Sequence, residues 1–131
     1  MATQAKLPGT LPTPAAARSN LRLVREEVRR KRGVAESMKA RVDAAKEELK
    51  AADAETEEVE GDLLDADEGT PLDVSAGANH HKALRRLAHA RTDLDKVRAT
   101  QRLAKSELKE ALGRLRAARE DMEAIREGRR R

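Results

Sequence analysis

The sequence predicts an all-α protein: an antiparallel coiled-coil helical hairpin of two long helices, over about 14–60 and 80–127, with an extended N-terminal arm. Apolar residues recur in steps of three and four along both segments, as a coiled-coil seam requires. The chain contains no aromatic residue and 40% of its residues are charged. Because aromatic side chains usually dominate cores, a thick core is excluded. A more compact helical bundle is the alternative.

Residues 1–13 form the predicted arm. They include two prolines and a glycine and no acidic residue, a composition typical of extended, polyproline-like chain. Thr13 and Pro14 then indicate a helix start. The threonine hydroxyl can accept a hydrogen bond from an amide of the first turn, and proline at the first helical position lacks an N–H that would have no partner.

In the first helix the seam positions, a and d of a heptad, stay in phase over six repeats. Only Lys31 and Thr56 are not apolar, and Gly33 falls on the outermost position. There the glycine costs about 1 kcal/mol relative to alanine but leaves the seam in phase. The predicted seam residues are Leu21, Val24, Val28, Lys31, Ala35, Met38, Val42, Ala45, Leu49, Ala52, Thr56, Val59 and Leu63.

Residues 61–79 are predicted to form an acidic turn, since they hold five acids, no base, three glycines and Pro71. The segment from Thr70 to Asp73 has the form of a capping box, so one helical turn could lie inside the loop. Asn79 is the expected cap of the second helix.

The second helix carries alanine at almost every second seam position and mostly leucine at the others. Small residues in alternate layers let two helices approach closely. Residues 128–131 are predicted to form a basic C-terminal tail. The predicted seam residues are Ala83, Leu87, Ala90, Leu94, Val97, Gln101, Ala104, Leu108, Ala111, Leu115, Ala118, Met122 and Ile125.

The charge pattern predicts how the helices pair. The acidic end of the first helix and the basic start of the second match when paired residue numbers sum to about 145, which places Leu21 near Ile125. An exposed ion pair contributes at most about 1 kcal/mol. The charges therefore select direction and register, while the apolar seam provides the stability.

Several leucines fall outside the seam. They could be ordinary exposed side chains, or they could bind a protein partner or a second copy that completes a four-helix bundle. We expect a protein partner or a homo-oligomer. The candidate partner-binding residues are Leu7, Leu11, Leu84, Leu103 and Leu112.

Two basic runs are candidates for contact with nucleic-acid phosphates or with an acidic protein surface; the alternative is a solvated helix face and a flexible terminus. Phosphate contacts would weaken as salt rises. Without aromatic residues there is no base-stacking platform, so only the backbone could be contacted. The runs are Arg29, Arg30, Lys31 and Arg32, and Arg129, Arg130 and Arg131.

The residue sets that carry chemistry are not assembled in this sequence. There is no cysteine, no phosphate-binding glycine loop and no pair of histidines at metal-ligand spacing. We therefore expect no enzyme, cofactor, metal site or small-molecule substrate. With no apolar run long enough for a signal peptide or a membrane span, a soluble protein, cytoplasmic or within a virion, is expected.

A proline-containing arm, a charged helical hairpin and a basic tail together resemble the layout of small assembly proteins such as phage scaffolding, adaptor or minor virion components. The resemblance implies a non-catalytic structural or assembly protein that acts as a spacer or docking subunit. The alternative function is a small nucleic-acid-binding or regulatory protein that contacts phosphates through its basic end.

Overall fold

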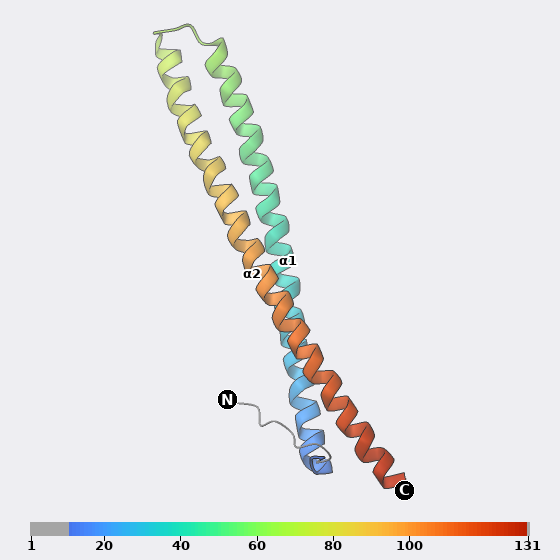
Figure 1. The fold of residues 1–131 in the computed structure, drawn as a ribbon. Helices are drawn as coiled ribbons and strands as arrows, with labels where there is room; N and C mark the ends of the chain where they lie inside the picture. The colour runs from blue at the N-terminus through green and yellow to red at the C-terminus, as the bar shows by residue number, and fades with distance from the viewer. Residues whose placement is uncertain (1–10, 131) are drawn as a thin grey trace. The chain divides into compact units, whose positions relative to one another are not determined.

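The computed structural model describes residues 11–130, except for the side chain of Arg130. Two long helices, α1 (Pro14–Asp65) and α2 (Pro71–Arg130), form a helical hairpin (Figure 1). The predicted all-α hairpin is thereby confirmed. Most of the predicted arm lies outside the described residues, and residues 11–13 precede α1 without helical structure.

Helix α1 begins where Thr13 and Pro14 predict. Thr13 Oγ1 accepts a hydrogen bond from the amide of Ala16 at 3.2 Å, which satisfies one of the amides that the first helical turn leaves unpaired. All 13 seam positions predicted in each helix are buried or half-buried. The heptad pattern therefore identifies the packed face of both helices.

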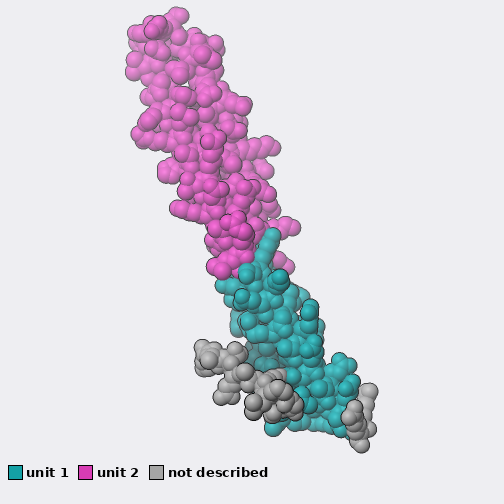
Figure 2. Space-filling view, in the orientation of Figure 1, with its two compact units in different colours: residues 1–35, 104–131 teal, residues 36–103 magenta. Residues whose placement is uncertain are grey.

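Both helices pass through two compact units, residues 1–35 with 104–131 (unit 1) and residues 36–103 (unit 2), as Figure 2 shows. In unit 1 the buried cluster consists of Val24, Val28, Ala111 and Leu115. In unit 2 a second cluster consists of Ala52, Leu87 and Ala90, with Leu49 packed against it.

The seam tolerates one buried hydroxyl. Thr56 is 5% exposed, and its Oγ1 donates a hydrogen bond to the carbonyl of Ala52 at 2.8 Å. Because the acceptor belongs to the preceding turn of the same helix, the hydroxyl needs no partner from water or from a polar side chain. A polar residue can thus occupy this layer without an unsatisfied group.

The turn is shorter than the predicted 61–79. Residues 61–65 continue α1 and α2 begins at Pro71, so only residues 66–70 connect the helices. The seam itself explains the extra helix, because Ala76 continues the heptad phase and is buried. Burial of that side chain outweighs the low helix propensity of the neighbouring glycine and asparagine. The expected cap at Asn79 is wrong: this residue lies inside α2 and is exposed.

The capping motif lies where the sequence predicts it but starts the whole second helix. The amide of Asp73 donates to Thr70 Oγ1 at 3.3 Å, and the amide of Gly69 donates to Asp73 Oδ2 at 3.1 Å. Gly69 has a φ of 77°, the left-handed conformation that glycine adopts without strain. These contacts close the short connection.

The predicted register is wrong by about one heptad. Val28 shares a cluster with Ala111, and Ala52 shares one with Leu87, so paired residue numbers sum to 139. The predicted pairing of Leu21 with Ile125 would require paired residue numbers whose sum is higher by seven. The shorter turn explains the shift, and a slip of seven residues, about 10 Å, leaves every seam position in the seam.

The register can be tested by disulfide trapping, since the chain has no cysteine of its own. Val28→Cys with Ala111→Cys should oxidise readily within one molecule, because a disulfide needs Cα atoms within about 7 Å. Val28→Cys with Ala118→Cys, one heptad further along, is the matched control and should oxidise slowly. Thiol titration with mass spectrometry measures both, and faster oxidation of the control pair would contradict the register.

The glycines give a second test. Gly33 and Gly113 lie inside helices, and a Cβ at either position would meet nothing within 4 Å. Replacing each with alanine should raise the free energy of unfolding by about 0.5–1 kcal/mol, because alanine restricts the unfolded chain and favours helix. Gly69→Ala should do the opposite, because of its positive φ. Urea unfolding followed by circular dichroism decides the sign of each.

Candidate functional site

Exposed positions beside the seam fall into two flanks. Heptad positions e and b follow one side of the seam, and positions g and c follow the other. In unit 2 Arg86 contacts Glu48 and Glu55, all three at g positions. In unit 1 Arg114 contacts Glu27, again both at g. Within each unit the g flanks of α1 and α2 therefore adjoin each other, and the e flanks adjoin on the other side.

Arg86 is the most heavily engaged cation of unit 2. Its Nε donates to Glu48 Oε1 at 2.9 Å, and its Nη1 donates to Glu55. The hydrogen bond from Arg86, and then its positive charge, lower the pKa of Glu48, while the hydrogen bonds to Glu48 and Glu55 raise the pKa of Arg86. Because the side chains are about half exposed, this cluster aligns the helices more than it stabilises them.

The predicted basic run of residues 29–32 does not form one patch. Successive residues of a helix point about 100° apart, so the four side chains diverge. Lys31 occupies the seam, where its Nζ lies 2.9 Å from Glu107 Oε2. Arg30 lies on the g flank, while Arg29 and Arg32 lie on the e flank, and all three are exposed.

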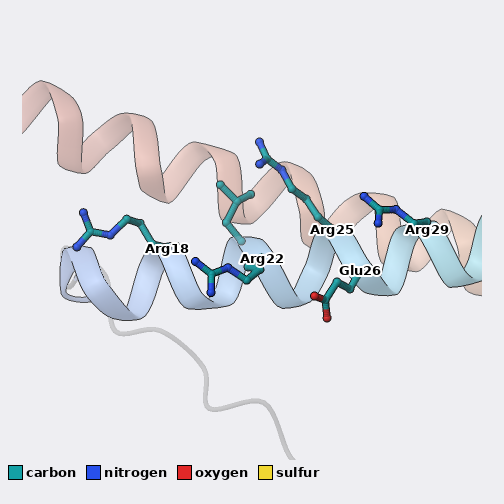
Figure 3. Close-up of a pocket in the computed structure, with 6 residues that line it drawn as sticks. Arg18, Arg22, Arg25, Glu26 and Arg29 are labelled. Atoms are coloured by element: carbon teal, nitrogen blue, oxygen red, sulfur yellow. The ribbon is translucent and has the colours of Figure 1, made fainter.

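A longer row of arginines follows the e flank of α1. The residues are spaced by four and three, all five are exposed, and no acidic residue interrupts the row. Four of them line an open hollow of about 350 Å³, together with Leu21 and Glu26 (Figure 3). The sequence analysis missed the first three members because it searched for consecutive cations, although their heptad spacing was visible. The row consists of Arg18, Arg22, Arg25, Arg29 and Arg32.

The second predicted basic run is only partly described. Arg129 belongs to α2 and lines a small hollow of about 120 Å³ with Arg18, Arg126 and Ile125. Residues 128–130 thus continue the helix instead of forming a separate tail. The side chain of Arg130 and the whole of Arg131 lie outside the described residues.

The predicted partner-binding leucines are exposed, but the structure does not bring them together. Leu84 and Leu103, 42% and 60% exposed, belong to unit 2. Leu112 and Leu11 belong to unit 1, and Leu7 lies outside the described residues. Leu103 is at a c position, whereas Leu84 and Leu112 are at e positions. Within unit 2, Leu84 and Leu103 thus lie on opposite flanks and do not share one surface.

The most exposed large apolar side chains surround the turn of the hairpin. Leu64, Leu72 and Val74 are 86%, 73% and 71% exposed. A hollow of about 310 Å³ beside them is lined by Leu72, Asp62 and Asp65, among others. This segment was predicted as an acidic turn and these residues were missed; the signal was three large apolar residues outside the seam among five acids. We call the set the turn surface: Leu64, Leu72 and Val74 with Asp62, Asp65, Asp67, Glu68 and Asp73.

Two of the three histidines take part in surface contacts. His80 Nε2 lies 3.3 Å from Glu60 Oε1, and His81 Nε2 lies 3.0 Å from Arg85 Nη2. Among residues 11–130 there is no group of three or more His, Asp or Glu side chains that could hold a metal ion. Within the same residues, neither helix has a stretch apolar enough to cross a membrane.

Comparison with known proteins gives no relative from which a function could be transferred. No family model matches the chain, and neither the curated proteins nor the solved structures provide a match.

The cluster around Arg86 predicts a pH dependence. Arg86→Met should lower the free energy of unfolding at neutral pH, because it removes both contacts to the glutamates. Since the folded pKa of Glu48 is lowered, the contribution is present above the ordinary glutamate pKa of about 4.3 and is lost as pH falls through the folded value. Unfolding curves of both proteins should thus converge in acid, whereas a difference that grows in acid would contradict this account.

Proposed function

We propose that this protein is a non-catalytic structural or assembly protein, a helical hairpin that docks on a protein partner through its turn surface. The observation that carries the proposal is the exposure of Leu64, Leu72 and Val74, between 71% and 86%, in a structure whose other apolar side chains mostly pack in the seam. Exposed apolar clusters rimmed by polar groups are typical of protein interaction sites.

The charge of the turn surface indicates the chemistry of the partner. Residues 61–79 hold five acids and no base, so a complementary surface would be basic around an apolar centre. Leu72 lies at a g position, whereas Leu64 and Val74 lie at b positions on the other side of the seam. A partner that contacts all three residues therefore has to surround the turn and contact both sides of the seam.

The architecture supports a spacer role for the rest of the hairpin. A coiled-coil seam fixes the relative position of neighbouring turns of two helices without requiring a large core. The resemblance in layout to small phage assembly proteins agrees with this role. That the protein is not an enzyme stays a prediction.

The test is site-specific photo-crosslinking in the native source. A photoreactive residue at position 64 or 72 should give an adduct with one defined protein, because both side chains are exposed beside the turn. Position 103 is the matched control, since Leu103 is 60% exposed but lies away from the turn. Introducing Val74→Ser beside the crosslinker should reduce the adduct severalfold, because an apolar anchor is removed.

Two outcomes would contradict the proposal. The same adducts at positions 64, 72 and 103 would indicate unspecific contact. If the adducts consist only of a second copy of this chain, the turn surface mediates self-association and does not bind a separate basic partner. Sedimentation at several protein concentrations would then detect the self-association.

A further inference from the structure

A strongly basic flank of unit 1 has no role in the proposed docking at the turn. We infer that this flank is a binding surface for the phosphate backbone of duplex nucleic acid. The flank comprises the e and b positions of both helices within unit 1. The basic residues of the flank whose side chains the structure describes are Arg18, Arg22, Arg25, Arg29 and Arg32 of α1, and Lys105, Lys109, Arg116, Arg119 and Arg126 of α2.

The α1 half of the flank is a straight row of cations. Its first and last arginines, Arg18 and Arg32, are 14 positions apart, which corresponds to about 21 Å along a helix. Figure 3 shows four of them along one side of α1, with Arg25 directed toward α2. Glu26, the acidic residue that lines the same hollow, points away from Arg25 in this view. Among the residues that line this hollow, four arginines thus accompany a single acid.

The α2 half lies on the same side of the seam. The ion pair between Arg114 and Glu27 joins the two g flanks of unit 1, which leaves the e flanks together on the other side. A direct observation agrees: Arg18 of α1 and Arg126 of α2 line one hollow with the seam residue Ile125. The cations of both helices thus belong to one continuous surface.

The two flanks of unit 1 differ sharply in charge. Among the side chains that the structure describes, the e flank has ten basic residues and one acid, Glu123. The g flank has two basic residues, Arg30 and Arg114, and four acids, Glu27, Glu107, Glu110 and Asp121. Like charges four residues apart destabilise a helix by about 0.2–0.5 kcal/mol per pair. Arg18 with Arg22, and Arg25 with Arg29, are two such pairs on the flank, and a polyanion that binds there would relieve their repulsion.

The composition of the flank favours nucleic acid over other polyanions. Interfaces with proteins have an apolar centre, whereas interfaces with DNA are polar and strongly positive. Leu112 is the sole large apolar residue among the e and b positions of unit 1 that the structure describes, which also argues against insertion into a lipid surface. Arginine suits the planar geometry of phosphate contacts.

The absence of aromatic residues favours binding to a duplex over binding to a single strand. Proteins that bind single strands stack bases on aromatic side chains, and this chain has none. Contacts to phosphates carry no sequence information directly. The flank should therefore prefer a duplex, whose phosphates are densely spaced, and should bind different sequences alike.

The experiment is a salt titration with a fluorescent 20-base-pair DNA duplex, measured by anisotropy on the full chain. The flank variant carries Arg22→Gln, Arg25→Gln and Arg29→Gln. The control variant removes the same charge from exposed g and c positions by Arg30→Gln, Arg41→Gln and Lys96→Gln. Circular dichroism verifies that both variants keep the helices of the parent.

We expect affinity for the duplex to fall steeply with salt. The flank variant should bind at least tenfold more weakly at 0.1 M salt, and its log–log salt slope should be smaller by about 3, since each phosphate contact contributes about 0.9. The control variant should stay within about twofold of the parent. A second duplex of unrelated sequence should bind equally, and a single strand of the same length more weakly.

Several results would overturn the inference. They are binding that is indifferent to salt, equal losses in the two variants, and poly-glutamate binding as tightly as the duplex with the same dependence on the flank, which would identify an acidic protein as the ligand. A variant with Leu64→Ser and Leu72→Ser should bind the duplex like the parent, so that failure of the docking proposal and failure of this inference are distinguishable.

Discussion

The narrow apolar seam is the constraint on which the rest of the structure depends. With no aromatic residue available, the buried surface comes from alanine, leucine, valine and methionine at two of every seven positions. Ala52 and Ala111 are 0% exposed, which shows how closely the helices approach at these layers. Close approach leaves little apolar area per layer, so many layers in phase are needed. The seam consequently extends even into residues 71–79, where Gly77 and Asn79 have low helix propensity.

The heptad pattern predicts which face of each helix is buried but not which layers meet. A shift by seven residues exchanges one a or d residue for another, so the apolar pattern is almost indifferent to it. The length of the turn selects one of these registers. Five connecting residues place Leu63 opposite Ala76, as the register in which paired residue numbers sum to 139 requires. The turn length was misjudged because local propensity at Gly77 and Asn79 was given more weight than the seam position of Ala76.

The candidate surfaces were harder to predict for a related reason. A run of consecutive cations is conspicuous in a linear sequence, yet a helix distributes it over the seam and both flanks, as Lys31, Arg30 and Arg29 illustrate. Residues that share a surface recur by three and four, and Arg18, Arg22 and Arg25 satisfy that spacing. The exposure of Leu64 depended on where the turn begins, which was predicted five residues too early.

The seam also explains how one short chain can present chemically different surfaces. Because stability resides at positions a and d, the flanks are free to diverge in charge. In unit 1 the g flank has acids and bases that meet across the helices, as Arg114 and Glu27 do. The described side chains of the e flank in unit 1 include ten cations and one glutamate. This flank therefore has few opposite charges that could pair across the helices and align them. In unit 1 the ion pair between Arg114 and Glu27 thus joins the helices on the g flank, which leaves the cations of the e flank available to the external anion that we infer.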